Sequence, residues 1–168
     1  MLETTTNAGL HDFVMEHVRR YAAKPDQAAL DLGAGPGALA VRLRDLGFET
    51  TAADRDTAGY KADLPFVRID LNERDFAARL GVGTFGLVTA VEVFEHTESP
   101  INFLWNPARL LNPDGVAIAT TPNVEGIPAG VSFFLAGKIQ MMDERSEPAP
   151  YLPFSGISSR GNIRRGLD

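Results

Sequence analysis

The N-terminal part of the chain carries the apolar spacing of a helix. Leu10, Val14 and Tyr21 belong to a set of apolar residues that recur three or four positions apart, while charged residues occupy the other side. Beyond residue 25 the pattern changes to short apolar runs, each followed by a segment of helical spacing. The runs predict five strands, at residues 28–32, 48–53, 66–69, 85–91 and 116–121. The segments between them predict helices at 38–46, 75–80 and 99–111.

Strands that alternate with helices in this way are typical of a doubly wound α/β fold. Right-handed crossovers make such a sheet mostly parallel and place helices on both of its faces. The run 85–91 is mostly apolar, as expected of a strand that is covered on both faces. Ligands bind these sheets at the C-terminal ends of the strands, near the point where the strand order reverses. Functional residues are therefore expected at the strand exits.

The first strand ends in a glycine-rich turn that opens a helix. Gly33, Gly35 and Gly37 alternate there, which is not expected of a turn that serves packing alone, and they let a ligand approach the backbone. The helix behind the turn presents free N–H groups to an anion. With Asp54 at about the right distance, the turn fits either a dinucleotide or a nucleoside that carries an amino acid. Asp31 favours the second ligand, because a carboxylate pointing into the cleft would repel a diphosphate and attract an ammonium group.

Several segments, taken in order, resemble those of a known enzyme family. The turn from Asp31 to Gly37 is similar to the first motif of the class I S-adenosylmethionine-dependent methyltransferases. Segment 90–96, Ala-Val-Glu-Val-Phe-Glu-His, resembles the branch that contains ubiquinone-biosynthesis-like O-methyltransferases. Further agreement comes from residues 51–54, 69–72, 110–115 and 120–123. The resemblance spans roughly residues 28–123 and implies a Rossmann-like sheet that binds S-adenosylmethionine, with S-adenosylhomocysteine as the product.

The resemblance also implies a methyltransferase that acts on a small-molecule acceptor, at oxygen. After the fifth strand the family continues with a helix and two strands that close the sheet, and these strands are not found in residues 123–168. We therefore interpret residues 1–122 as the core with its N-terminal helix, and 123–168 as an irregular tail or lid of the same domain. A non-catalytic module that binds S-adenosylmethionine or S-adenosylhomocysteine is an alternative. A nicotinamide-dependent oxidoreductase is less favoured because of Asp31.

Cofactor contacts are implied for residues at four strand exits. Asp54 would accept hydrogen bonds from the ribose hydroxyls, and Asp70 would accept one from the adenine amino group. Both have structural alternatives, since an Asp at a strand end starts turns and Asp70 could cap the helix that follows. The predicted cofactor-binding residues are Asp31, Gly33, Ala34, Gly35, Gly37, Asp54, Arg55, Asp70, Leu71, Ala90 and Glu92.

His96 is the candidate catalytic base. It is the only histidine near the predicted cleft, because His11 and His17 belong to the first helix, and an imidazole titrates near neutrality. Alternatively, His96 could orient a helix or contact the cofactor. Glu92, Glu95 and His96 also resemble part of a metal site in some RNA-end methyltransferases, but no downstream histidine completes it, so no metal is predicted.

The composition of the chain limits the classes of partner and the cellular compartment that we expect. The net charge of −6 and the sequence pI near 5.1 argue against nucleic acid as a partner. The absence of cysteine excludes disulfides and a thiol nucleophile. Neither a leader pattern nor an apolar run of about 20 residues is found, so we expect a cytoplasmic protein without a transmembrane segment. An exposed edge of the fifth strand and the apolar cluster 133–135 would allow a homodimer.

Overall fold

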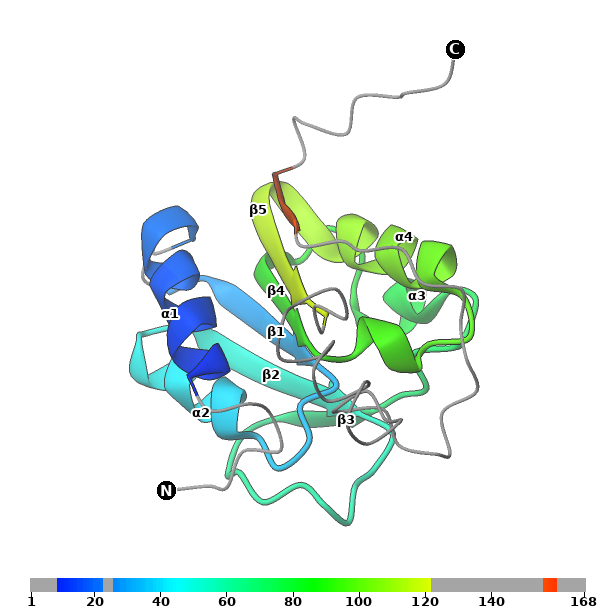
Figure 1. The fold of residues 1–168 in the computed structure, drawn as a ribbon, viewed down its shortest axis with the longest axis horizontal. Coiled ribbons are helices and arrows are strands. Elements are labelled where there is room, and N and C mark those ends of the chain that lie inside the picture. The colour runs from blue at the N-terminus through cyan, green and yellow to red at the C-terminus, as the bar shows by residue number, and fades with distance from the viewer. Residues whose placement is uncertain (1–8, 23–25, 122–155, 160–168) are drawn as a thin grey trace, which may run out of the picture.

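The computed structural model describes residues 9–22, 26–121 and 156–159 of the chain (Figure 1). Its helices are α1 (Leu10–Tyr21), α2 (Ala38–Asp45), α3 (Phe76–Leu80) and α4 (Pro100–Leu110), with a 3-10 helix, η1, at Phe94–His96. Its strands are β1 (Ala28–Leu32), β2 (Glu49–Asp54), β3 (Phe66–Arg68), β4 (Phe85–Val91), β5 (Leu111–Thr120) and β6 (Gly156–Ser159). No helix within the described residues has the length and apolar character to span a bilayer.

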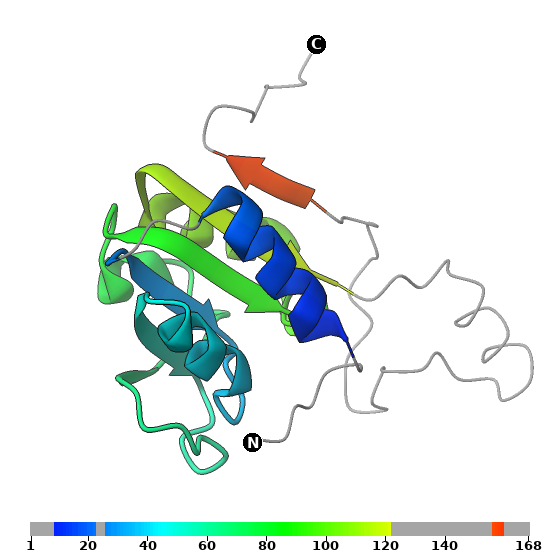
Figure 2. The same cartoon turned by 90° about the vertical axis from the view of Figure 1, so that its left-hand side faces the viewer.

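The strands form one sheet in the order β3-β2-β1-β4-β5-β6. β1 to β5 pair in parallel, and the order reverses between β1 and β4 because the chain returns from β3 at one edge to the other side of β1. α1 and α2 cover one face of the sheet, and α3 and α4 cover the other (Figures 1 and 2). The predicted fold, a doubly wound and mostly parallel Rossmann-like sheet, is confirmed.

Successive side chains along each strand point to opposite faces of the sheet, and this produces two separate apolar cores. Ala29 and Leu87 face α1 and α2, whereas the residues next to them face α3 and α4. Asp31 lies two residues beyond Ala29 and pairs in register with Thr89, two residues beyond Leu87. Both polar side chains therefore lie on the face covered by α1 and α2. This places a carboxyl group at the edge of a core where the sequence suggested an open cleft.

Two polar side chains fix α3 against α4. Asp75 accepts a hydrogen bond from the Ala78 N–H at 3.1 Å, which caps α3, and pairs with Arg109 of α4 at 2.6 Å. Asn106 of α4 is fully buried and accepts a hydrogen bond from the Ala77 N–H at 2.9 Å. A helix of five residues is too short to be stable alone, so these contacts are needed to hold α3 in place.

The tail contributes a strand that the sequence did not predict. β6 pairs antiparallel to β5, with Ser159 opposite Val116. Its four residues, Gly-Ile-Ser-Ser, are too few to show a recognisable alternation. Because β6 occupies the outer edge of β5, the free edge on which the homodimer prediction rested is not present. The cluster 133–135 and most of segment 123–168 lie outside the described residues.

β5 begins earlier than predicted and contains a bulge. Leu111 pairs with Phe85, while the next paired residue, Val116, lies opposite Leu87. Residues 112–115, which lie between the predicted helix and the predicted strand, therefore bulge out of β5. The apolar run at 116–121 predicts the buried part of β5. It does not predict that Leu111, on the other side of the polar residues 112–115, also pairs with β4.

Candidate functional site

The carboxyl ends of β1, β2 and β4 meet where the strand order reverses, and the glycine-rich turn lies among them (Figure 1). The turn is fixed to the end of β2 by three hydrogen bonds. The N–H groups of Gly33 and Ala34 donate to the Ala53 carbonyl at 2.8 and 3.3 Å. The Gly35 N–H donates to Asp54 Oδ2 at 2.9 Å. The turn therefore occupies the position at which doubly wound sheets bind ligands.

Two of the glycines are required by contacts within the chain. Gly33 has a φ of +67°, and a Cβ there would overlap the side chain of Val93, which follows β4. Gly37 has a φ of +91°, and a Cβ there would lie 2.5 Å from Ala62 Cβ and 2.8 Å from Tyr60 Cε2, in the connection from β2 to β3. At both positions a glycine is needed because another segment of the chain packs closely against it. The spacing of the glycines in the sequence does not distinguish this role from ligand binding.

Asp54 joins the end of β2 to the turn. Its Oδ2 accepts a hydrogen bond from the Gly35 N–H, and its Oδ1 accepts one from the Asp56 N–H at 3.0 Å. An ionised carboxylate offers about four acceptor positions, so both oxygens can accept further hydrogen bonds from a ligand. The turn-forming role and the ligand-binding role of Asp54 are thus compatible. Arg55, next in the chain, is exposed.

Asp31 is buried at the end of β1, beneath the turn. The residue is 2% exposed, and its Oδ1 accepts a hydrogen bond from the Thr89 hydroxyl at 2.7 Å. Its Oδ2 has no hydrogen-bond partner among the described residues. Burial raises the pKa of Asp31 to about 7; the Thr89 hydroxyl and the Ala40 N–H lower it, and the charge of Asp54 raises it further. A cation brought to Oδ2 would favour the ionised form.

Asp70 and Leu71 follow β3 at the next strand exit. Asp70 is exposed, and its Oδ1 accepts a hydrogen bond from the Asn72 N–H at 2.9 Å. The prediction that Asp70 could cap α3 is wrong, because Asp75 is the cap. Leu71 is half-buried and packs against the core that faces α3 and α4. Asp70 therefore shapes the turn and leaves a carboxylate oxygen at the surface.

Ala90 and Glu92 stand at the exit of β4. The side chain of Ala90 is 2% exposed and belongs to the core under α3 and α4. Glu92 has a φ of +54°, and its N–H lies 3.1 Å from the Thr120 carbonyl oxygen and 3.2 Å from the Thr120 hydroxyl. A non-glycine residue in this region costs on the order of 1–3 kcal/mol, and such residues cluster at functional sites. The strained bend ties the exit of β4 to the end of β5.

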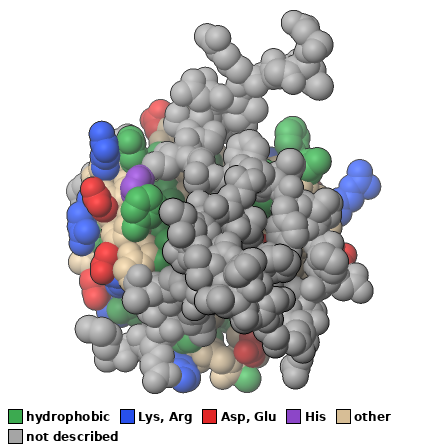
Figure 3. Space-filling view, viewed as in Figure 1, with side chains coloured by type: hydrophobic (Ala, Val, Ile, Leu, Met, Phe, Trp, Pro, Cys, Tyr) green, Lys and Arg blue, Asp and Glu red, His purple; other side chains and the backbone are tan. Residues whose placement is uncertain are grey.

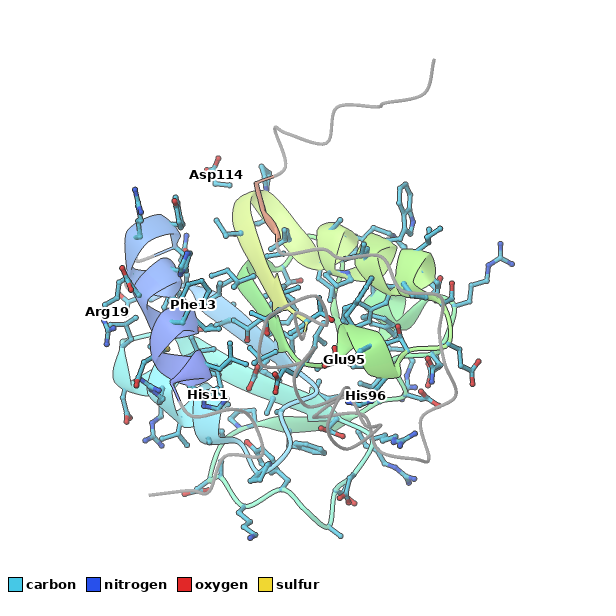
Figure 4. The ribbon with its side chains drawn as sticks, in the orientation of Figure 1. His11, Phe13, Arg19, Glu95, His96 and Asp114 are labelled. Atoms are coloured by element: carbon cyan, nitrogen blue, oxygen red, sulfur yellow. The ribbon has the colours of Figure 1, made fainter. Side chains whose placement is uncertain are left out.

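The predicted base, His96, is exposed, whereas its neighbour Glu95 is half-buried (Figure 4). Burial raises the pKa of Glu95, against hydrogen bonds from its own backbone and from the Thr121 side chain that lower it. Its Oε2 is buried with no hydrogen-bond partner among the described residues. Because Thr121 follows β5, Glu95 lies between the exits of β4 and β5. The sequence did not single out Glu95, because apolar periodicity does not show which of two adjacent polar side chains is covered.

The sequence matches the family model described as a methyltransferase domain over residues 7–157, most of its length. The chain belongs to this methyltransferase family. The matched segment of the methyltransferase contains every strand exit described above. A curated relative is the ubiquinone biosynthesis O-methyltransferase of Caulobacter vibrioides, which is 34% identical over 101 residues that cover 56% of the chain and 40% of the relative. The chain thus spans less than half the length of this relative.

Solved structures agree with the methyltransferase fold. A SAM-dependent methyltransferase from Archaeoglobus fulgidus superposes with a TM-score of 0.63 and 17% identity, over 85% of the chain and 63% of that structure. A 4+2 cyclase superposes with a TM-score of 0.57 and 18% identity, over 66% of the chain and 44% of that structure. Likeness at this level of identity shows the fold alone, and the cyclase illustrates that one fold hosts different reactions.

Proposed function

We propose that the chain binds S-adenosylmethionine at the exits of β1, β2 and β4 and transfers its methyl group to an oxygen of a small-molecule acceptor. Family membership supports methyl transfer, and the relative from Caulobacter vibrioides supports oxygen as the acceptor atom. The observation that carries the cofactor is the buried Asp31 carboxyl, whose Oδ2 lacks a partner among the described residues. An ammonium group would supply that partner, whereas a diphosphate would be repelled, which argues against a nicotinamide cofactor.

The side chains at the strand exits fit this cofactor. Asp54 keeps acceptor positions for the ribose hydroxyls, and the exposed oxygen of Asp70 can accept from the adenine amino group. Leu71 offers apolar surface to the adenine ring, and the methionine part would lie beside the turn and the exit of β4. The proposed cofactor-binding residues remain Asp31, Gly33, Ala34, Gly35, Gly37, Asp54, Arg55, Asp70, Leu71, Ala90 and Glu92.

S-adenosylmethionine, when bound, supplies a methyl group that its sulfonium already activates. The chain's own residues then position the acceptor hydroxyl and take its proton. Glu95 suits this task, because it lies on the β5 side of the β4 exit, away from Asp54 and Asp70. A carboxyl whose pKa is raised by burial is a stronger base than an exposed one. We therefore propose Glu95 Oε2 as the proton acceptor, and His96, predicted for this role from the sequence, remains the alternative base.

The net charge of the chain supports the proposed class of acceptor. A net charge of −6 favours a small molecule over a nucleic acid, since phosphates would be repelled. The cytoplasmic location stays a prediction. A second candidate function is a module that binds the cofactor without transferring the methyl group.

Replacing Asp54 by alanine tests the proposed cofactor site. The variant should lose about 1.5–3 kcal/mol of S-adenosylhomocysteine binding, the range for a hydrogen bond to a charged group. Isothermal titration calorimetry measures this loss. Asp56→Ala is the matched control, because the Asp56 side chain accepts only the N–H groups of its own turn, and it should bind like the wild type. A folded wild-type chain that binds neither S-adenosylmethionine nor S-adenosylhomocysteine would refute the proposed function.

Replacing Glu95 by glutamine tests the base. Turnover should fall by about 10²–10⁴ while the affinity for S-adenosylhomocysteine stays unchanged, because only proton transfer is removed. Transfer of labelled methyl from S-adenosylmethionine to a panel of catechols and hydroxybenzoates measures turnover. His96→Gln is the control; a large loss there, with none for Glu95→Gln, would return the base role to His96. Tight cofactor binding without transfer to any acceptor would favour the non-catalytic module.

A further inference from the structure

The outward face of α4 carries three large apolar side chains. Ile101 is 79% exposed, Leu104 is 45% exposed and Trp105 is 67% exposed. Their spacing of three and four residues places them in one row, here called the α4 stripe, opposite the side of the helix that packs on the sheet. Residues 100–108 contain no charged side chain. A helix that faces water on this side would normally carry charges there, so the α4 stripe has the composition of a contact surface.

Exposed aromatic side chains on α1 differ from the α4 stripe. Phe13 and Tyr21 form a row with His17, with ring centroids 4.2 and 6.1 Å apart. Arg20 lies over the Tyr21 ring at 5.3 Å from its centroid. The aromatic side chains of α1 therefore contact one another and a neighbouring charge. Apolar side chains reach the surface over both helices in Figure 3, and charged residues flank the α4 stripe only beyond its two ends, at Glu98 and Arg109.

We propose that the α4 stripe is the contact face of a homodimer in which two α4 helices pack antiparallel about a two-fold axis. Such an axis brings the same surface of each copy together, so every contact occurs twice. With the axis between residues 104 and 105, Leu104 would contact the partner's Trp105, and Ile101 would lie over the partner's Ala108. The small Ala108 leaves room for the larger side chain opposite it. This proposal does not depend on the proposed methyl transfer.

The charges at the two ends of α4 favour a second copy as the occupant. Glu98 precedes α4 and is exposed, and Arg109 lies in its last turn with 34% of its side chain exposed. Arg109 already pairs with Asp75 of its own chain at 2.6 Å, and in the antiparallel arrangement the exposed part of its side chain would also come close to the partner's Glu98. The antiparallel arrangement also places the N-terminus of one helix beside the C-terminus of the other, so that the helix dipoles attract. In an antiparallel pair, the apolar rows of the two copies therefore face each other, and the negative end of each row faces the positive end of the other.

The size of the α4 stripe suits a reversible dimer. With about 150–250 Å² for each large side chain, the exposed parts sum to roughly 400 Å² per copy. That is about half of the roughly 800 Å² per partner that a stable interface buries. Backbone and polar side chains beside the stripe would supply the rest of the contact, as the rim of an interface does. We therefore expect dissociation on the order of micromolar concentrations.

Trp105 is the single tryptophan of the chain, so its fluorescence reports on this face directly. Dilution of the full-length chain from about 200 to about 1 µM should dissociate such a dimer by mass action. Trp105 emission should then shift to longer wavelength and become more sensitive to acrylamide, because the indole passes from a covered to an exposed environment. Sedimentation velocity over the same concentrations should show the mass fall from two chains to one.

Leu104→Glu should weaken the dimer by at least about tenfold, since it places two carboxylates in an apolar contact and leaves the Trp105 reporter intact. Phe13→Glu, the same kind of change at a residue 54% exposed on α1, is the matched control and should leave the dimer unchanged. Ile101→Glu, at the most exposed position of the stripe, repeats the test should Leu104→Glu unfold by circular dichroism. A wild-type chain that stays monomeric, or stripe variants that dimerise like the wild type, would overturn the proposal.

Discussion

At the scale of single residues, Asp31 is the group whose charge depends most on the fold. Burial raises its pKa to about 7, while the Thr89 hydroxyl and the Ala40 N–H, which favour the charged form, only partly offset this effect. Near neutral pH the site therefore contains both the protonated and the ionised form. An ammonium group placed beside Oδ2 would stabilise the ionised form, so binding of an amino-acid cofactor would release a proton.

Asp31 should make the protein less stable as the pH rises from about 4 to about 7. In that interval the folded state keeps a proton that the unfolded state, in which the carboxyl has its ordinary pKa of 3.8, has released. Because the folded state binds more protons, the free energy of unfolding falls with pH, by as much as about 4 kcal/mol, and levels off above pH 7. Urea unfolding at a series of pH values measures this slope.

Asp31→Asn should remove that slope, because the amide does not titrate and can still accept a hydrogen bond from the Thr89 hydroxyl. The variant should gain stability relative to the wild type on going from pH 4.5 to pH 8. The exposed Asp114→Asn serves as the control and should follow the wild type. Parallel curves for the wild type and Asp31→Asn would show that burial does not shift the pKa as inferred.

At the scale of elements, α3 and α4 show what an apolar pattern leaves out. The pattern predicts both helices, yet α3 depends on a polar residue in another helix. Asn106 is fully buried; its amide accepts from the Ala77 N–H and donates to the Asn102 and Arg74 carbonyls at 2.9 and 3.3 Å. In the sequence this asparagine is one polar residue inside a helix, and two of its partners lie about 30 residues away. Periodicity carries no information about such contacts.

Asn106→Ala should lower the free energy of unfolding by about 2–3 kcal/mol, because it leaves the buried Ala77 N–H without an acceptor. For a chain of this size the melting temperature should fall by about 5–10 °C. Asn102→Ala on the same helix is the control; its side chain is half-buried and makes one bond, to the Glu73 carbonyl at 3.3 Å, so it should lose less than half as much. Equal losses in the two variants would contradict the role of Asn106.

At the scale of the whole molecule, the parallel sheet with helices on both faces could be predicted, and the contacts across its strand exits could not. The glycine turn and Asp54 lie at adjacent strand exits, as expected from a parallel sheet. The burial of Asp31 could not be foreseen, since it depends on the helices that cover one face. The same holds for Gly33, whose neighbour Val93 follows β4, and for β6, which pairs with β5.

The hydrogen bond from the Gly35 N–H to Asp54 has a further consequence. It connects the backbone expected to lie beside the methionine part with the side chain expected to hold the ribose, so the two halves of the cofactor site are aligned before any ligand arrives. The turn is ordered when the chain folds, so the entropic cost of ordering it does not reduce the affinity for the ligand, and the site is preorganised. A cofactor that occupies this site should therefore associate with little rearrangement of the backbone.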